Sequence, residues 1–90
     1  MKDKEIYNEY ILPLLQYDEK YSGELFHTID EYIECRENMT AAAKKLFIHR
    51  NTMMYRLKQI EEILGVDIDS REALFCIQTG LYIKKIIDTE

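Results

Sequence analysis

The sequence predicts an all-α fold, a small helical domain of about five helices that contains a helix-turn-helix. Two observations carry this prediction. Apolar residues recur at spacings of three and four, as in Met53, Leu57 and Ile60, which places them on one face of a helix. Between residues 40 and 65, two such helices are joined by a turn too short for an ordinary linker. Ninety residues make one domain, 1–90, with a modest core.

Residues 3–12 are expected to form the first helix. Pro13 lacks an N–H donor and disfavours helix in the residue before it, so we expect a kink or break near Leu12. Leu14, Leu15 and Tyr17 would then pack as a short turn. The polar segment 17–23, YDEKYSG, is expected to be a loop.

A second helix is predicted from about Ser22, a suitable cap, to about Arg36, with Glu37 and Asn38 ending it. Its apolar side is interpreted as core, and its acidic residues as a solvated face. The apolar side comprises Leu25, Phe26, Ile29, Tyr32 and Ile33, and the acidic residues are Glu24, Asp30, Glu31 and Glu34.

The predicted helix-turn-helix spans about residues 40–64. Thr40 is expected to cap its first helix, and alanines 41–43 extend that helix at low cost. Phe47 and Ile48 form the turn and its packing. The second helix begins between residues 49 and 51, carries its apolar face on Met53, Leu57, Ile60 and Leu64, and ends at Gly65.

The last helix is expected to run to about Ile87, after a link whose Val66 and Ile68 pack against the core. Asp69 and Glu72 have the spacing of a capping box. Apolar residues surround much of this helix, which indicates burial on several sides or contact with a partner. Gly80 in its middle would allow a neighbouring helix to approach closely, although a merely tolerated glycine is an equal alternative.

Charge is distributed unevenly along the chain. Residues 38–60 hold five Lys or Arg residues and no Asp or Glu, whereas the segments before and after carry four basic with ten acidic and three basic with seven acidic residues. In a helix-turn-helix the second helix lies in the DNA major groove, so this basic segment would be the surface that meets phosphate. The net charge of -5 of the whole chain argues against binding to nucleic acid. A protein interaction or oligomerisation module, with the basic stretch as a solvated face, is therefore the alternative.

Other classes of function find no support in the residues. There is no Gly-rich phosphate loop, no nucleophile elbow and no pair of catalytic acids, so we expect no enzyme and no cofactor. Cys35 and Cys76 are isolated, and His27 and His49 are far apart, so no metal site is expected. Apolar runs of only a few residues predict no membrane span, and reduced thiols favour a cytoplasmic protein.

The segment LFIHRNTMMYRLKQIEEILGVDID resembles the C-terminal DNA-binding domain of the PucR and CdaR family of bacterial transcriptional regulators, whose core is His-Arg-Asn-Thr-Leu-x-Tyr-Arg-Leu. The preceding residues resemble the family too, and the Thr-x-Ala-Ala and Arg-x-Thr elements more distantly resemble Fis-type nucleoid proteins. The matching residues are His49, Arg50, Asn51, Thr52, Met53, Met54, Tyr55, Arg56 and Leu57.

Two residues depart from the family pattern. Met53 replaces leucine in an apolar slot of similar volume, and Met54 stands where the family often has arginine, which changes one expected DNA contact. The resemblance implies a sequence-specific DNA-binding domain at the C-terminal end of a longer regulator, so effector sensing is expected in regions outside these residues.

Helix geometry then assigns the contacts, because successive residues advance by about 100°. We expect base contacts from His49, Arg50, Asn51, Thr52 and Met54, and contacts to the DNA backbone from Lys44, Lys45, Tyr55, Arg56 and Lys58. Tyr55 as a core residue is the alternative for that position. Glu61 and Glu62 would repel phosphate, so the contacting face ends near Lys58.

The expected partner is double-stranded DNA, bound by a homodimer, because one short basic face offers few contacts and the last helix is unusually apolar. Binding to RNA is disfavoured because no exposed aromatic sheet is predicted.

Overall fold

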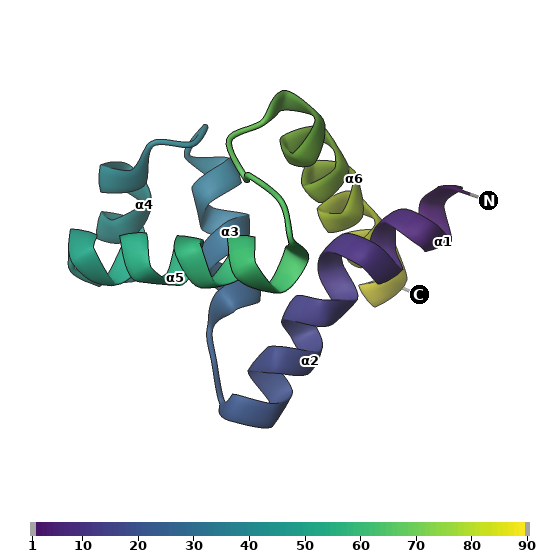
Figure 1. The fold of residues 1–90 in the computed structure, drawn as a ribbon, viewed down its shortest axis with the longest axis horizontal. Coiled ribbons are helices and arrows are strands. Elements are labelled where there is room, and N and C mark those ends of the chain that lie inside the picture. Colours follow the sequence, from purple (N-terminus) through teal and green to yellow (C-terminus); the bar gives the residue numbers. More distant parts are fainter. Residues whose placement is uncertain (1, 90) are drawn as a thin grey trace.

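The computed structural model describes residues 2–89, and no strand occurs among them. Its elements are α1 (Lys2–Ile6), the π-helical turn η1 (Tyr7–Ile11), α2 (Leu12–Tyr21), α3 (Leu25–Glu34), α4 (Met39–Leu46), α5 (Arg50–Leu64) and α6 (Arg71–Asp88). Because α1, η1 and α2 follow one another without a loop, these residues form five helical segments (Figure 1). The predicted all-α class is confirmed.

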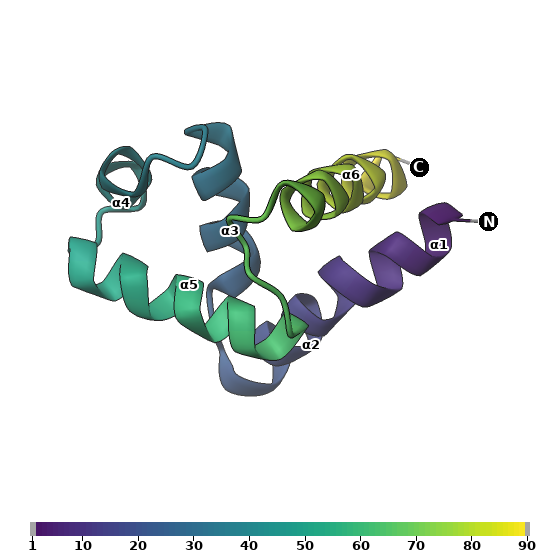
Figure 2. The ribbon, with the colours of Figure 1, turned by 45° about the horizontal axis from the view of Figure 1, so that its top comes forward.

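Helix α3 is the central element. It contacts α4 and α5 on one side and α6 on the other, and α2 packs against both α3 and α5. Helix α6 lies mainly against η1 and α1. Two views show α4 and the start of α5 at the end of the molecule remote from α1 and the end of α6 (Figures 1 and 2). The helix-turn-helix thus lies at one end of the molecule, and the remaining helices pack behind it.

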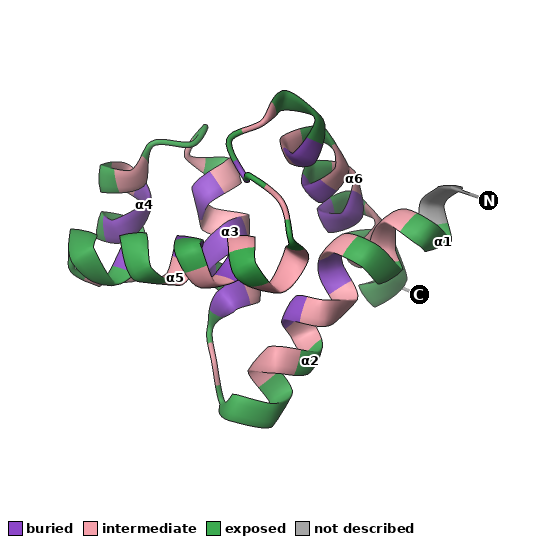
Figure 3. Ribbon diagram, viewed as in Figure 1, coloured by how far each residue is buried: buried purple, intermediate pink, exposed green. Residues whose placement is uncertain are grey.

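The core is made by one face of each helix from η1 to α6, as Figure 3 shows in purple. Residues 25, 29, 53, 57 and 60, which were predicted to face inward, are all buried. Ile68 in the link is also buried, and Val66 packs against the core. Both predictions for the link are confirmed.

Of the kink or break predicted near Leu12, the break is wrong, and the helix is distorted there by a π-helical turn. Pro13 lies in the first turn of α2, and the Leu12 N–H donates to the Tyr7 carbonyl five residues back, which is the hydrogen bond of a π turn. A wider turn relieves the clash that a proline ring otherwise makes with the carbonyl four residues earlier. The helix therefore accommodates the proline by a local bulge and continues.

The predicted turn at residues 14–17 and loop at 17–23 are also wrong, because α2 extends through Tyr21. Only residues 22–24 separate α2 from α3. Ser22 ends α2 in the left-handed conformation and does not cap α3. Instead, the Asp18 carboxylate accepts hydrogen bonds from the N–H groups of Leu25 (2.8 Å) and Phe26 (2.9 Å). The polar segment is thus helical, and its aspartate caps the next helix.

Two further caps differ from expectation by one or two residues. The Asn38 side chain, not Thr40, accepts from the Ala41 N–H and caps α4. Ser70, not Asp69, caps α6 by accepting from the N–H of residue 73. The Asp69 carboxylate instead accepts from the buried Tyr32 hydroxyl (2.7 Å). Burial and then this hydrogen bond raise the pKa of Tyr32 above its ordinary value.

Gly80 is a position of close helix approach. A Cβ atom there would lie 2.5 Å from Cγ1 and 3.0 Å from Cδ1 of Ile11, whose side chain is fully buried in η1. The contact between α6 and η1 therefore depends on the absence of a side chain at this position.

Replacing Gly80 by alanine should destabilise the domain, although alanine is the better helix former by about 1 kcal/mol. Overpacking a fixed core costs about 1–3 kcal/mol, which outweighs that gain. Thermal denaturation followed by circular dichroism measures the difference, with the exposed Gln78→Ala as control. A Gly80→Ala variant with a higher melting temperature than wild type would contradict the close packing.

Candidate nucleic-acid interface

The turn between α4 and α5 consists of residues 47–49. Phe47 adopts the left-handed conformation (φ 59°) where glycine is usual. Its N–H donates to the Lys44 carbonyl (3.1 Å), and the Ile48 N–H donates to the Ala43 carbonyl (3.0 Å), so the end of α4 is closed. Phe47 is 94% exposed, so the expectation that it packs in the turn is wrong. Ile48 alone packs against the core there.

His49 caps the start of α5. Its Nδ1 accepts a hydrogen bond from the Asn51 N–H (3.0 Å). This bond requires a lone pair on Nδ1, so the proton of the neutral ring is on Nε2, which is available as a donor. The predicted start of the second helix between residues 49 and 51 is confirmed, and Gly65 ends it in the left-handed conformation (φ 69°) as predicted.

The first half of α5 presents a polar, basic surface to solvent. Met53, Leu57 and Ile60 face inward and are buried. The outward residues Arg50, Asn51, Thr52, Met54, Tyr55 and Lys58 are all exposed. The alternative that Tyr55 belongs to the core is wrong, because it is 65% exposed. Figure 3 shows this end of α5 as largely exposed ribbon.

Arg56 differs from the other predicted contacts because it is half-buried. Its Nη1 donates to the Oγ1 atom of Thr28 on α3 (3.2 Å). Thr28 is fully buried, and its own hydroxyl proton is donated to the Glu24 carbonyl (2.7 Å). Sequence reasoning missed Thr28. The only sign in the sequence that Thr28 is buried was its place directly before Ile29, which lies on the apolar side of the helix.

Two lysines and two glutamates lie at the edges of this surface. Lys44 and Lys45 are exposed in the last turn of α4. The Nζ atom of Lys45 lies 3.8 Å from Oε1 of Glu31 on α3. Toward the other end of α5, the Glu61 carboxylate accepts from the Ile68 N–H (3.2 Å) and Glu62 is exposed. Glu61 therefore also holds the link after α5.

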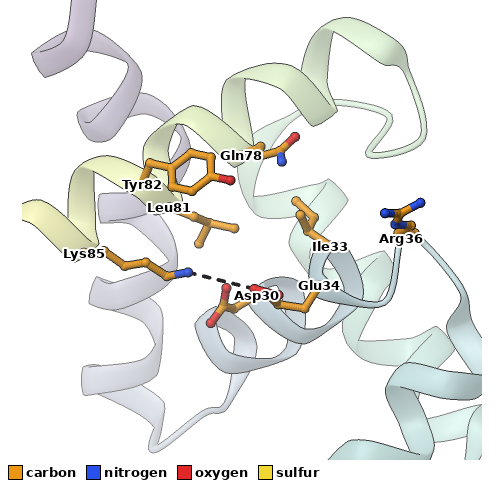
Figure 4. Close-up of a pocket in the computed structure, with 8 residues that line it drawn as sticks. All are labelled: Asp30, Ile33, Glu34, Arg36, Gln78, Leu81, Tyr82 and Lys85. Atoms are coloured by element: carbon orange, nitrogen blue, oxygen red, sulfur yellow. Dashed lines mark ion pairs between the residues drawn. The ribbon is translucent and has the colours of Figure 1, made fainter.

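A separate pocket of about 290 Å³ lies between α3 and α6 and includes no residue of α4 or α5 (Figure 4). The Nζ atom of Lys85 on α6 lies 3.9 Å from Oε2 of Glu34 on α3. The two side chains form a weak ion pair that spans the pocket. Burial raises the pKa of the Asp30 carboxyl, although the nearby Lys85 opposes that shift. Ile33 and Leu81 also line this pocket.

Other kinds of site are not seen in residues 2–89. Among residues 4–89, whose side chains are described, no group of three or more His, Cys, Asp or Glu residues could hold a metal ion. Cys35 and Cys76 are free thiols, each half-buried. None of the helices in this range has the length and apolarity needed to cross a membrane.

The fold and this surface define a helix-turn-helix domain, with α4 and α5 as its two helices. The chain belongs to the family of PucR C-terminal helix-turn-helix domains, whose profile matches residues 25–83. The resemblance inferred from the motif is thereby confirmed. The domain is a DNA-binding module of transcriptional regulators and does not belong to an enzyme family.

Curated relatives agree with this family. The chain is 31% identical over 84 residues to the purine catabolism regulatory protein of Bacillus subtilis, which covers 93% of this chain and 16% of the relative. It is 33% identical over 78 residues to the DNA-binding transcriptional activator AdeR of the same organism, covering 87% of this chain and 18% of AdeR. The proline-responsive transcriptional activator PutR of Bacillus subtilis is 43% identical over 51 residues, covering 57% of this chain and 12% of PutR. The chain thus spans about a sixth of the length of the first two relatives.

Replacing Phe47 by glycine should stabilise the domain, because a left-handed backbone costs a residue with a Cβ about 1–2 kcal/mol. Part of this gain is lost to the greater entropy of glycine in the unfolded chain, so a net gain of about 1 kcal/mol is expected. Urea denaturation measures the free energy of unfolding. Phe47→Ala is the matched control, since it removes the exposed ring but keeps the Cβ, and it should give no comparable gain. Equal stabilisation by both variants would show that the ring, not the backbone, was costly.

Proposed function

We propose that this domain binds specific DNA sequences by placing α5 in the major groove. The observation that carries the proposal is the helix itself, whose inward face is buried while its first half presents exposed polar and basic side chains. The N-terminal end of a helix also favours phosphate, because its free N–H groups carry partial positive charge. The family match supports DNA binding, and the specificity and groove geometry belong to the proposal.

Base contacts are assigned to His49, Arg50, Asn51, Thr52 and Met54. Arg50 can donate two hydrogen bonds to a guanine edge, and Asn51 can pair with an adenine edge. Each such pair discriminates against the wrong base by about 1–3 kcal/mol. The Nε2 of His49 is free to donate because Nδ1 is used in the cap. Thr52 and Met54 offer methyl groups to thymine, and Thr52 also offers a hydroxyl to phosphate.

Contacts to the DNA backbone are assigned to Lys44, Lys45, Tyr55, Arg56 and Lys58. These side chains position the helix without specifying sequence. Lys44 and Lys45 are exposed in the last turn of α4, which packs against α5, and Lys58 is exposed in the middle of α5. Glu61 and Glu62 place negative charge beyond Lys58, which limits the contacting face to the first half of α5.

Residues 1–90 act in this proposal as a single DNA-binding domain at the C-terminal end of a longer cytoplasmic regulator of transcription. The relatives are several times longer than this chain, and the matching family is defined as a C-terminal domain. Effector sensing is then a property of the remaining regions.

Selection from random duplex DNA tests the proposal. The wild-type domain should enrich a sequence motif, and its affinity should fall steeply with salt because phosphate contacts release counterions. The double variant Arg50→Ala with Asn51→Ala should lose the motif but keep its circular dichroism spectrum. A helix-face control is Glu62→Ala, which should retain the motif. Absence of DNA binding at low salt would favour the protein interaction module, for which the comparisons give no support.

We also propose that the domain works as a homodimer that uses α6 to contact a second copy. Phe75, Tyr82 and Ile86 are exposed and lie seven and four residues apart, which places them on one outward face of α6. Two domains would then occupy half-sites about 34 Å apart on the DNA, one helical turn. This spacing requires the two recognition helices to face the same side of the duplex.

Sedimentation equilibrium tests this dimer. The wild-type domain should associate, alone or on DNA with two half-sites, and the variant Phe75→Ser with Ile86→Ser should shift to monomer while keeping its helical spectrum. These side chains are exposed, so their loss should cost little stability. A wild-type domain that stays monomeric both free and on such DNA contradicts the dimer.

A further inference from the structure

A groove of about 270 Å³ runs between the α2–α3 turn and one flank of α5. In Figure 2 the turn lies below α5, on the side away from α4. The groove is lined by residues of both walls, among them Tyr21, Ser22, Glu24, Thr52, Tyr55 and Arg56. Three of these, on α5, already belong to the proposed DNA surface. The groove is therefore continuous with that surface and extends it beyond the helix-turn-helix.

Arg56 is held at this groove by a residue that cannot itself reach solvent. Thr28 is fully buried, and its hydroxyl accepts from Nη1 of Arg56 (3.2 Å). The hydroxyl proton is committed to the Glu24 carbonyl (2.7 Å), so the lone pairs are turned toward the guanidinium. A guanidinium has five N–H donors, and this bond leaves the others available for an anion.

The opposite wall is fastened to α5 as well. The Tyr17 hydroxyl accepts from Nε2 of Gln59 (3.0 Å), and the Tyr17 and Tyr21 rings lie 4.8 Å apart. Lys20 places its ammonium 5.3 Å from the Tyr21 ring centre. Asp18 fixes the start of α3 by its two backbone hydrogen bonds. Both walls are thus set relative to each other before any ligand arrives.

We propose that this groove receives a phosphodiester of the DNA strand that borders the recognition helix. Arg56 and the Thr52 hydroxyl would donate to its oxygens, the aromatic rim of Tyr21 and Tyr55 would cover the adjoining sugar, and Thr28 acts as the positioning residue of Arg56. This inference rests on the proposed DNA binding. It adds that the α2–α3 turn, outside the helix-turn-helix, forms the second wall of the backbone contact.

Glu24 allows a test in which the variant should bind DNA more tightly than the wild type. Its exposed side chain lines the same groove, so its negative charge opposes a phosphate there. Both the N–H and the hydroxyl of Thr28 bond to the Glu24 backbone carbonyl, not to its side chain. Replacing Glu24 by glutamine therefore removes a charge from the groove and leaves the Thr28 bonds in place.

The experiment measures affinity for a fluorescent duplex selected by the wild-type domain, over a range of salt concentrations, for Thr28→Val, Thr28→Ser, Arg56→Gln and Glu24→Gln. Arg56→Gln should lower the slope of log affinity against log salt by about 0.9, the effect of one phosphate.

Thr28→Val should weaken binding about five-fold, as expected from one lost hydrogen bond, and its slope of log affinity against log salt should also be smaller. Thr28→Ser, which keeps the hydroxyl, should restore both. Glu24→Gln should bind about two-fold more tightly, a small effect because solvent screens the exposed carboxylate that is removed.

The outcomes separate this inference from the function on which it rests. If the wild type binds and Arg50→Ala with Asn51→Ala loses selection, but Thr28→Val and Arg56→Gln match wild type, the groove is overturned and the recognition helix stands. If the wild type binds no duplex, both are overturned. If circular dichroism shows that Thr28→Val is unfolded, Glu24→Gln decides, because unchanged or weaker binding overturns the phosphate site.

Discussion

The burial of Met53, Leu57 and Ile60 is the constraint on which the rest of the domain depends. These side chains fix how α5 is rotated about its own axis, because they leave only one face of the helix free. They also hold α5 against α3, which in turn joins α4 and α6 to the same core. The outward positions of Arg50, Asn51 and Tyr55 follow from this packing. Removing it would change the direction of every side chain on the exposed surface.

This dependence explains why much of the candidate surface could be predicted from the sequence. The helical period is fixed by backbone geometry, so identifying the inward apolar residues also identifies the outward polar ones. The turn at residues 47–48 was predicted because the two periodic segments are joined by too few residues for an ordinary linker, and Gly65 was predicted to end the second helix. The prediction failed for Phe47 itself, since its ring is outside the core while its backbone makes the turn. Hydrophobicity suggested packing, but the left-handed geometry directs the side chain to solvent.

The errors at helix ends have a different cause. Asn38 and Thr40 are both good caps, as are Asp69 and Ser70, and their intrinsic preferences differ by only a fraction of a kcal/mol. At α6 the choice follows a tertiary contact. Asp69 is taken by the Tyr32 hydroxyl, which leaves Ser70 to cap α6. Likewise, the polar segment after Leu15 is helical, and its Asp18 supplies the cap of α3 in place of Ser22. The Asp69 contact joins residues 37 apart in the sequence, and the Asp18 bonds cross from one helix to the next, so neither follows from the pattern within one helix.

The same reasoning applies to Arg56 and Thr28, which lie 28 residues apart and meet only through the packing of α3 on α5. This contact has an electrostatic consequence for an acidic domain. The net charge of -5 repels DNA at long range, but at physiological salt such repulsion is screened beyond about 8 Å. Attraction must therefore come from cations that reach the phosphates directly. A guanidinium held in place by a buried hydroxyl loses less conformational freedom on binding than a free side chain does, so it retains more of its contact energy. A few positioned cations on α5 can then outweigh the larger negative charge spread over the rest of the domain.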